Sequence, residues 1–526
     1  MRTRMFLTIV VIVVLLTSVG GATARFGAKA PAAPQTAVGA GFTFQGQLKN
    51  AGGVVSGNCD MTFRLFDDAA TSVQIGSTIT ATVPVSNSLF TVMLNSNGEF
   101  GVNAFNGYAR WLEVAVKCAG DAAYTTLSPR QQITAAPYAQ YSLTGNNAPH
   151  TPYVPLQRPQ TLDLATVDSQ LKGFNGAFTD GQYGYFVPGS DGISYVGKVA
   201  RVDLHSYITN SIAVLDLTTV DAALKAFASG FSDGRYGYFV PNSGRSSGKL
   251  ARLDLQNFSV AGVTVLDLTT VDPTLIGFAG GFSDGHYAYL APETPLLSKV
   301  VRINLQDFST TGVSVLDLAT VDPALKGFLG GFTDGRYGYF VPYRNPSFFG
   351  KLVRVDLQNF AASGVTVLDL TSIDSSLVGF AGGFTDGRYG YIVPDRTSDF
   401  TYHGKFVRVD LQNFSTSGVT ILDLTTVNPN LTGYRGGVAI GGYAYIFPHY
   451  NSVSIGHGEI VRVDLQNFSV SGVTYLDTSL TDPGLKGFYG GFTDGQNIYL
   501  SPYASDDSTT QGKVARIQLF SGAGAP

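Results

Sequence analysis

Charged residues are scarce in this chain. Lys, Arg, Asp and Glu make up 14% of the 526 residues, and the net charge is only −4. Ordinary domains carry about 25% charged residues. A chain with so few basic side chains lacks the electrostatic patch with which proteins bind nucleic acid or an acidic membrane surface. We therefore expect no nucleic-acid partner.

Long apolar runs are also missing, apart from one near the N-terminus. Arg2 and Arg4 precede a mostly apolar run over residues 5–16, and the small triplet Ala-Thr-Ala follows at 22–24. The run is shorter than the about 20 residues that a membrane-spanning helix needs. The pattern predicts a secretory signal peptide over residues 1–24 rather than a membrane anchor. We expect a secreted or cell-surface protein without a membrane span.

Cysteine is limited to one pair, Cys59 and Cys118, and both residues lie in strand-like segments. In the oxidising compartment that a signal peptide implies, an even cysteine count favours a disulfide. The alternative is a pair of buried free thiols. No cysteine directly follows the N-terminal apolar run, so a lipid anchor is not indicated.

What the chain does have is a repeat of about 50 residues. Its fullest copy is VLDLATVDPALKGFLGGFTDGRYGYFVPYRNPSFFGKLVRVDLQNF, residues 315–360. The leucines that open the successive LDL or LDT copies are Leu162, Leu215, Leu266, Leu316, Leu368, Leu422 and Leu476. Such a period predicts either a solenoid or a propeller.

Each copy contains four strand-like segments. GFLGGFT and RYGYFV flank Asp334-Gly335, a strong hairpin signal, and KLVRVDL and VTVLDL follow. Four antiparallel strands in about 50 residues describe a propeller blade. Between blades, Asp322 followed by Pro323 predicts the N-cap and first position of a single helical or 3₁₀ turn.

The two ends of the repeat region are incomplete in a complementary way. TLDL at 161–164 is a fourth strand without the first three, and the last copy ends after its third strand. Pairing these ends completes a seventh blade and removes a free edge, whereas a solenoid would need capping repeats. We therefore predict a seven-bladed β-propeller over 161–520, closed by its N-terminal strand.

The chain before the repeats forms a separate unit. Short β-rich runs such as FTFQGQL and RWLEVAVKC between 40 and 142 predict a small β-sandwich or jelly roll. Four prolines make 143–160 a stiff linker. Residues 25–39 are expected to be disordered, and 521–526 form a tail. The predicted fold class is thus all-β throughout.

A resemblance adds context to this first unit. FTFQGQL, LFTVML, NGYARWLEVAV and YTTLSPRQQITAAPYA together resemble an N-terminal module of large exported bacterial proteins. In those proteins the module precedes repeats, fibres or adhesive regions. The resemblance implies a secreted or surface-displayed bacterial protein, and it implies no particular chemistry. The repeat region itself resembles seven-bladed β-propeller repeat proteins.

Residues present in every copy are predicted to hold the blades together. The third-strand arginines are Arg201, Arg252, Arg302, Arg354, Arg408, Arg462 and Arg516. Since blade faces stack on one another, we expect these arginines to form structural ion pairs with the aspartates two residues on, or with those of LDL. A ring of arginines binding an anion in the channel is disfavoured, because the first strand lines a propeller axis. The glycines before the hairpin turn are expected to let the innermost strands crowd the channel.

Only the loops between the second and third strands differ markedly among copies, and variable loops on a rigid scaffold are where binding usually resides. The candidate ligand-binding residues in these loops are Tyr195, Arg245, Tyr343, Arg344, Phe348, Asp395, Arg396, Tyr402, His403, His449, Tyr450, His457 and Tyr503. Aromatic, Arg and His groups suit a glycan or protein partner. The alternative is neutral drift of exposed loops.

Signals for catalysis, metals and cofactors are weak. Gly244-Arg245-Ser246-Ser247-Gly248 matches G-x-S-x-G, but it lies in a loop between strands rather than in a strand–turn–helix elbow. The histidines form no H-x-x-x-H motif, and the Asp-Gly turns lack the alternating acids of a calcium loop. We predict no catalytic residue, metal or cofactor.

The sequence thus favours a secreted or cell-surface interaction protein whose propeller loop face binds a glycan or another protein. The alternative is an extracellular hydrolase or lyase with its active site at the channel mouth. An enzyme is expected to gather titratable groups with shifted pKa values there, whereas a binder is expected to present an aromatic or polar surface. A third hypothesis, a structural shell component, predicts self-association.

Overall fold

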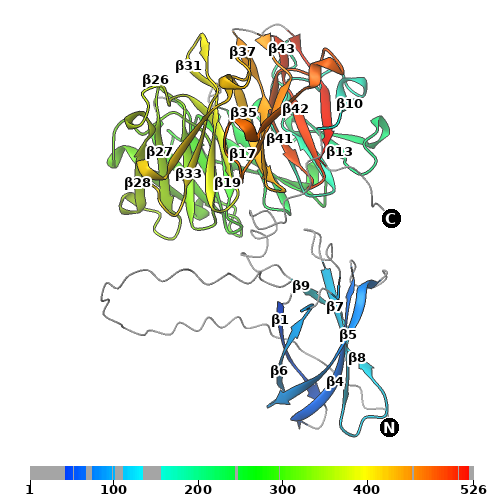
Figure 1. Cartoon of the computed structure of the whole chain (residues 1–526). Coiled ribbons are helices and arrows are strands. Elements are labelled where there is room, and N and C mark those ends of the chain that lie inside the picture. Colours follow the sequence, from blue (N-terminus) through cyan, green and yellow to red (C-terminus); the bar gives the residue numbers. More distant parts are fainter. Residues whose placement is uncertain are drawn as a thin grey trace, which may run out of the picture. The chain divides into compact units, whose positions relative to one another are not determined.

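The computed structural model describes residues 42–50, 53–66, 74–96, 99–100, 110–133, 156–242, 247–294, 297–452, 455–506 and 509–519. The predicted signal peptide, the segment 25–39, most of the linker, the tail and Arg245 lie outside these residues. The chain divides into two compact units, 1–140 and 141–526. Arrows dominate both of them in Figure 1. No helix in the described segments is long and apolar enough to cross a membrane.

The first unit is one antiparallel sheet around one core. Its strands are β1 (Phe42–Gln47), β4 (Gly57–Phe66), β5 (Gln74–Ser86), β6 (Leu89–Leu94), β7 (Arg110–Cys118), β8 (Thr125–Thr126) and β9 (Gln131–Ile133). The order is β1-β6-β5-β4-β7-β8, with β9 also on β7, and β2 (Lys49–Asn50) and β3 (Gly53–Val54) form a separate hairpin. The sequence predicted a small sandwich or jelly roll, and the described strands form a single continuous sheet. Alternate residues of β4, such as Met61 and Phe63, point into the core.

The predicted disulfide is confirmed. Cys59 on β4 and Cys118 on β7 are direct cross-strand partners and are bonded to each other. The bond therefore ties two central strands of the first unit. The alternative of free thiols is excluded, because the two cysteines are bonded to each other and the chain has no further cysteine.

The second unit is a β-propeller of seven four-stranded antiparallel sheets, which we call blades 1 to 7. The innermost strands are β11 (Ala177–Thr179), β15 (Phe227–Ser232), β19 (Phe278–Ser283), β23 (Phe328–Thr333), β29 (Phe380–Thr385), β35 (Tyr434–Ile440) and β41 (Phe488–Thr493). The second strands are β12 (Tyr183–Phe186), β16 (Tyr236–Pro241), β20 (Tyr287–Pro292), β24 (Tyr337–Pro342), β30 (Tyr389–Pro394), β36 (Tyr443–Pro448) and β42 (Asn497–Pro502). Each innermost strand contacts that of the next blade, and β41 contacts β11, so the ring is closed.

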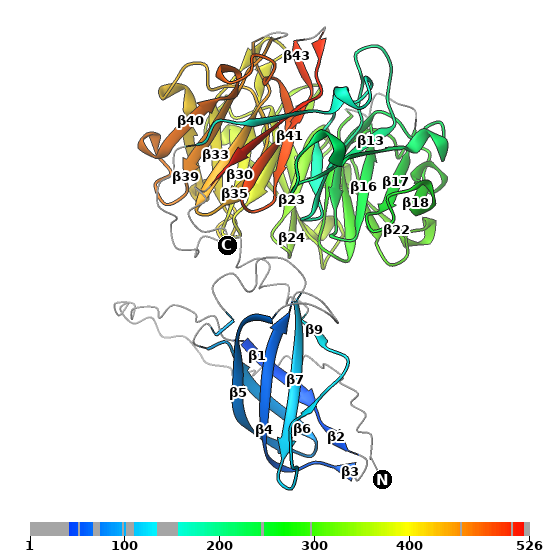
Figure 2. The same ribbon diagram turned by 90° about the vertical axis from the view of Figure 1, so that its right-hand side faces the viewer.

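The outer half of each blade completes its sheet. The third strands are β13 (Lys198–Asp203), β17 (Lys249–Asp254), β21 (Lys299–Asn304), β27 (Lys351–Asp356), β33 (Lys405–Asp410), β39 (Glu459–Asp464) and β45 (Lys513–Gln518). The outermost strands are β14 (Ile212–Asp216), β18 (Val263–Asp267), β22 (Val313–Asp317), β28 (Val365–Asp369), β34 (Val419–Asp423), β40 (Val473–Asp477) and, in blade 7, β10 (Gln160–Asp163). Figure 2 shows the propeller from a second side.

Blade 7 is assembled from both ends of the repeat region, as the incomplete copies predicted. β10 pairs antiparallel with β45, with Leu162 opposite Val514. Leu162 is buried in the same cluster as Tyr499 and Val514. A strand from the start of the propeller therefore occupies the place that β28 or β34 fills within a continuous copy.

Tight packing at the axis depends on glycine. Gly330 and Gly382 have φ values of +77° and +85°, which side chains rarely adopt. A Cβ on Gly330 would lie 3.6 Å from Cα of Gly382, and one on Gly280 would lie 3.0 Å from Cα of Gly330. The pairing of β23 with β24 shifts register between Phe328 and Gly331. These glycines let neighbouring backbones approach each other, as expected from the sequence.

The Asp-Gly turn is built by its carboxylate. Asp334 accepts hydrogen bonds from the backbone N–H groups of Arg336 and Tyr337 and, at 2.8 Å, from the hydroxyl of Tyr339. The same arrangement recurs at Asp180, Asp233, Asp284, Asp386 and Asp494. Turn formation and a buried tyrosine hydroxyl thus account for the repeated aspartate without a calcium ion.

The short helical turn between blades begins five residues earlier than predicted. A 3₁₀ turn covers Leu318–Thr320, and its N-cap is Asp317, whose carboxylate accepts from the N–H of Ala319. Its counterparts are Leu164–Thr166, Leu217–Thr219, Leu268–Thr270, Leu370–Ser372, Leu424–Thr426 and Thr478–Leu480. Asp322, the predicted cap, accepts from the N–H of Ala324 at 2.8 Å with one carboxylate oxygen and binds Nζ of Lys351 at 2.6 Å with the other. It therefore caps a tight turn after the 3₁₀ turn and also forms an ion pair with the third strand.

A second set of short 3₁₀ turns precedes the outermost strands. These turns cover Thr209–Ser211, Val260–Gly262, Thr310–Gly312, Ala362–Gly364, Thr416–Gly418 and Val470–Gly472. The QNF segments that lead into most of them place a phenylalanine against the preceding blade. For example, Phe414 contacts the ring of Tyr339.

The third-strand arginines are held by aromatic rings, which corrects the predicted ion pairs. The guanidinium of Arg354 lies 4.6 Å from the ring centre of Tyr337 in its own blade and 4.5 Å from that of Phe414 in the next blade. Arg201, Arg252, Arg302 and Arg408 are sandwiched in the same way. Arg462 lies over Tyr443 and Arg516 over Tyr207.

The carboxylates that we expected to pair with these arginines have other partners. Asp254, Asp356 and Asp410 form ion pairs with Arg235, Arg336 and Arg388 of the Asp-Gly turns. The LDL aspartates cap the 3₁₀ turns. Sequence spacing could not separate these partners, because one of the two rings that sandwich Arg354 and its counterparts comes from a different repeat.

Replacing Arg354 by Lys is expected to destabilise the propeller by about 1–2 kcal/mol, because an ammonium cannot stack between two rings as a planar guanidinium does. Asp356→Asn is the control. It keeps an oxygen for the N–H of Gln358 and should cost less than about 0.5 kcal/mol. Urea unfolding of both variants measures the difference. A larger loss for Asp356→Asn than for Arg354→Lys would restore the ion-pair interpretation.

Candidate functional site

Most of the variable loops form hairpins on one face of the propeller. They comprise β25 (Arg344–Asn345) with β26 (Ser347–Phe348), β31 (Arg396–Ser398) with β32 (Thr401–Tyr402), β37 (Tyr450–Ser452) with β38 (Ile455–Gly456), and β43 (Ala504–Asp506) with β44 (Thr509–Thr510). In Figure 1 the labels β26, β31, β37 and β43 follow one side of the propeller. β38 pairs with β43, which joins blades 6 and 7. In the described parts of the loops of blades 1 to 3, only the isolated bridges Ser190–Tyr195 and Asn242–Phe278 form.

An ion pair links the hairpins of blades 4 and 5. Nη1 and Nη2 of Arg344 lie 2.7 Å and 3.3 Å from the two carboxylate oxygens of Asp399. The same guanidinium lies over the ring of Phe348, which meets Tyr343 edge to face. Of the predicted loop residues, Arg344 and Tyr195 are the well-exposed ones here.

The hairpin tips also expose apolar side chains that the sequence analysis did not single out. Phe400 is 76% exposed, Ile193 97% and Ile455 53%. Exposed apolar groups on a loop face are typical of interaction surfaces. The missed signal was their position in the middle of loops that otherwise carry polar residues.

The three predicted histidines are each buried in a separate place. Nδ1 of His457 lies 2.7 Å from Oε2 of Glu459 and its Nε2 lies 3.1 Å from the carbonyl oxygen of Gly433. Nδ1 of His449 lies 2.8 Å from the carbonyl oxygen of Phe488. The backbone N–H of Lys405 donates to Nδ1 of His403 at 3.4 Å. No group of three His, Cys, Asp or Glu residues in the described segments could hold a metal ion.

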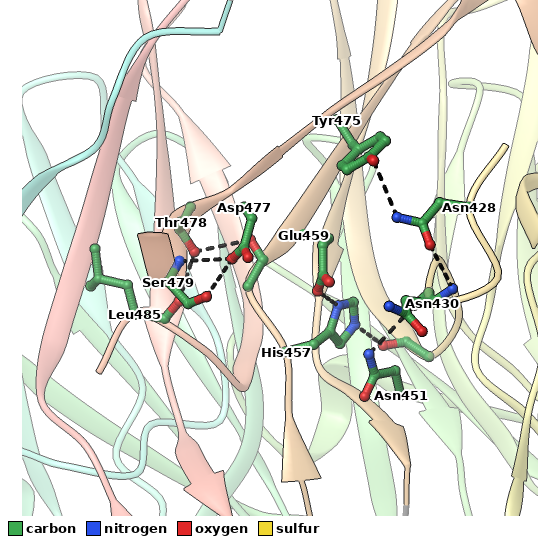
Figure 3. A network of polar contacts seen from close by, with 12 residues as sticks. Asn428, Asn430, Asn451, His457, Glu459, Tyr475, Asp477, Thr478, Ser479 and Leu485 are labelled. Atoms are coloured by element: carbon green, nitrogen blue, oxygen red, sulfur yellow. Dashed lines mark hydrogen bonds and ion pairs between the residues drawn. The ribbon is translucent and has the colours of Figure 1, made fainter. Parts of the chain in front are cut away.

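Blade 6 departs most from the repeat. Where other copies carry a lysine at the start of the third strand and an aspartate between blades, it carries Glu459 and Asn428. Figure 3 shows Glu459 beside His457, and Asn428 donating to the hydroxyl of Tyr475 at 3.2 Å. The repeated Lys–Asp pair is thus replaced by a different polar network in this one blade.

A pocket of about 210 Å³ lies at the axis. In blades 2 to 7 the aromatic residue that opens the innermost strand is followed by a residue that lines the pocket: Ala228, Ala279, Leu329, Ala381, Arg435 and Tyr489. In blade 1 the equivalent residue is Asn175, which follows Phe174 just before β11. Glycines complete the wall. Phe328 pairs with Pro342, which precedes the variable loop, so the pocket opens toward the hairpin face.

The pocket has two different halves. Ala279, Leu329 and Ala381 form an apolar cluster against which Tyr343 packs. Across the ring, consecutive blades 6, 7 and 1 contribute the polar side chains of Arg435, Tyr489 and Asn175. Arg435 is the only charged residue in the pocket lining that the structure describes.

Arg435 is anchored by few contacts. Its guanidinium lies 4.5 Å from the ring centre of Tyr489, and its Nη2 lies 3.7 Å from Oδ2 of Asp395, which is beyond hydrogen-bond distance. The same oxygen lies 3.3 Å from Nε of Arg396. Nε of Arg435 and Oδ1 of the fully buried Asp395 have no hydrogen-bond partner among the described residues.

Burial and charge shift the pKa values of the surrounding groups. Burial raises the pKa of Asp395, and Arg435 and Arg396 oppose this shift. Burial, aided by the charge of Arg435, lowers the pKa of His449 well below its usual value, so this imidazole is neutral at pH 7. Burial also raises the pKa of Tyr489 to about 12. His449 and Tyr503 in turn pack on the ring of Tyr489.

Some of the predicted loop residues therefore gather around a residue that the sequence analysis missed. Asp395, Arg396, His449 and Tyr503 surround the polar half of the pocket, and Tyr343 packs on the apolar half within reach of the charges of Asp395 and Arg435. Tyr195, Arg344, Tyr402, His403 and His457 have other surroundings. Tyr450 stacks on His449 at 4.2 Å. The signal for Arg435 was the sixth copy itself, which carries a charged residue in YRGG where the others read FNGA, FASG, FAGG, FLGG or FYGG.

Comparisons with known proteins give little beyond the fold. Residues 43–130 match a domain of unknown function, DUF8740. No curated protein has detectable sequence similarity to the chain. Among solved structures, hydrazine synthase of Kuenenia stuttgartiensis is 14% identical with a TM-score of 0.45, covering 63% of this chain and 93% of that one. The tricorn protease is 10% identical with a TM-score of 0.37, covering 79% of this chain and 37% of that one. Both TM-scores are below 0.5, so we draw no functional argument from them.

Buried His403 is expected to make stability depend on pH between about 6.5 and 4. Burial lowers its pKa to about 4, and the charge of Lys405 acts in the same direction. Because the unfolded state then binds the proton more tightly, stability falls as the pH falls through this window, by about 3 kcal/mol at most.

His403→Gln should remove that part of the loss, which urea unfolding at pH 7 and pH 4 measures. The Lys–Asp ion pairs make stability depend on pH only at lower pH, since the pKa of Asp272 in its pair is about 2. Identical pH dependence of the variant and the natural protein would show that His403 does not stay neutral in the folded state.

Proposed function

We propose that this is a secreted or cell-surface binding protein whose propeller captures a glycan on its hairpin face, over the mouth of the axial pocket. The propeller fold fits an interaction role. The observation that carries the proposal is the pocket itself, which is central, surrounded by variable hairpins, and lined by a largely enclosed arginine whose buried Nε has no hydrogen-bond partner among the described residues. Buried polar groups normally have partners, so a site that leaves them open favours a ligand.

The pocket favours a glycan over a large protein partner as the group that enters it. Its volume of about 210 Å³ is below the range of about 300–1,000 Å³ typical of drug-sized ligands. It therefore accommodates one sugar-sized group rather than a folded surface. Tyr343 and Tyr489 add the combination of an apolar ring and a polar hydroxyl that suits a sugar.

The alternative of a hydrolase or lyase has one observation in its favour, the gathering of groups with shifted pKa values around Arg435. Their contacts favour binding instead. Asp395 is fully buried between two arginines, and Nδ1 of His449 is held by the carbonyl of Phe488. Neither group presents a proton to a ligand in the pocket.

A glycan array with the full chain tests the proposal, together with a variant that combines Tyr195→Ala, Arg344→Ala and Phe400→Ala on the hairpin face. The control combines Arg235→Ala, Arg336→Ala and Arg388→Ala, which are exposed on the opposite turns. We expect at least tenfold weaker glycan binding for the first variant, because exposed aromatic and Arg side chains carry much of a binding energy.

The control should bind within about twofold of the natural protein. Equal binding by both variants would contradict a hairpin-face site. Cleavage of the bound glycan during the assay would instead favour the enzyme alternative.

A further inference from the structure

The guanidinium of Arg435 has no hydrogen-bonded acceptor among the described residues. A guanidinium carries five N–H donors. In the described structure it donates no hydrogen bond shorter than 3.5 Å, and its one ion-pair contact, to Asp395, is 3.7 Å long. Asp395 is closer to Arg396 than to Arg435. The N–H donors of Arg435, the strongest donors in the pocket, are therefore available to a ligand that enters it.

The local charge limits what that group can be. Two arginines, Arg396 and Arg435, face one carboxylate at Asp395, and the charge of Glu293 also reaches Tyr343 and Tyr489. His449 adds no charge. Asp395 and Glu293 together offset the two arginines, so the site has no positive excess to hold a phosphate or sulfate dianion. A planar monoanion matches the fork of Arg435, the guanidinium that makes no hydrogen bond within the described structure.

The two halves of the pocket indicate the rest of the ligand. Asn175 donates its side-chain N–H to the carbonyl of Phe227 at 2.7 Å, which leaves its amide oxygen as an acceptor in the pocket that Arg435 and Tyr489 also line. Opposite these groups lie Ala279, Leu329 and Ala381. A sugar acid has this same division, with a carboxylate and hydroxyls on one edge and a C–H face on the other.

We infer that the axial pocket binds an acidic sugar residue of the glycan, with its carboxylate paired to Arg435. The inference rests on the proposed function and specifies its ligand class. Arg435 binds the carboxylate, Tyr489 fixes the guanidinium by stacking beneath it, and Asn175 accepts from a sugar hydroxyl. Asp395 is a positioning residue that holds Arg435 at the pocket wall.

Isothermal titration calorimetry of the full chain with trigalacturonate and with its methyl ester tests the inference. The two ligands share one sugar skeleton, and the ester lacks the carboxylate charge and carries an added methyl group on each acid. We expect the acid to bind at least tenfold more tightly than the ester. Polyglutamate supplies carboxylates on a peptide and should bind far more weakly than the sugar acid. Equal affinity for the acid and the ester, or equal affinity for polyglutamate, would overturn the inference.

Arg435→Leu is the decisive variant, because blade 4 carries Leu329 at the same position and folds with it. It should weaken trigalacturonate binding about 10- to 100-fold, the loss of a charged hydrogen-bonded pair. Arg435→Lys should bind trigalacturonate with an affinity between those of the natural protein and Arg435→Leu. Lysine keeps the positive charge but cannot donate the paired hydrogen bonds of a guanidinium. Arg435→Leu combined with Asp395→Asn removes the buried charge imbalance and should bind as weakly as Arg435→Leu, with normal thermal stability.

The control Arg336→Ala lies in an Asp-Gly turn on the opposite face and should leave the affinity for the acid, and its preference over the ester, unchanged. Unchanged binding by Arg435→Leu would overturn the inference, even if the hairpin-face variants still lose glycans, in which case the proposed function stands. Absence of binding to every glycan by the natural protein would overturn both.

Discussion

Pairing between β10 and β45 is the constraint on which the rest of the propeller depends. Six blades are continuous copies of one repeat, and the seventh exists only because residues 160–163 return to residues 513–516. Without that strand, β45 would present an open edge, and Leu162 and Val514 would lose their shared cluster. With it, β41 meets β11 and the seven innermost strands surround one axis.

Closure turns small differences between copies into a site. The seven residues that follow the aromatic residue at or just before the start of each innermost strand are far apart in sequence and face one pocket only because the ring is complete. Six of them are uncharged. A single arginine in the sixth copy therefore makes the pocket asymmetric. Polar side chains from blades 6, 7 and 1 face apolar side chains from blades 2 to 5. The hairpins of blades 4 to 7 surround the same end.

The sequence was sufficient to predict the fold, but it was not sufficient to predict which side chains contact one another. Period, strand count and the complementary ends predicted the blades and their closure, because these are properties of one repeat. The partners of Arg354 and Asp322 depend on how neighbouring elements pack against them. The sequence analysis therefore missed Phe414 as a partner of Arg354 and Lys351 as a partner of Asp322. For the same reason the loop candidates included Asp395 and His449 but not Arg435, whose role follows from the pocket and not from its own repeat.

Stability of matched leucine variants tests closure most directly. Leu162 on β10 and Leu266 on β18 hold the same repeat position and are 5% and 4% exposed. The account predicts that Leu162→Ala and Leu266→Ala each cost about 2–4 kcal/mol in urea unfolding, since both empty a packed site between strands. A cost near zero for Leu162→Ala, beside the full cost for Leu266→Ala, would show that the N-terminal strand does not close the ring.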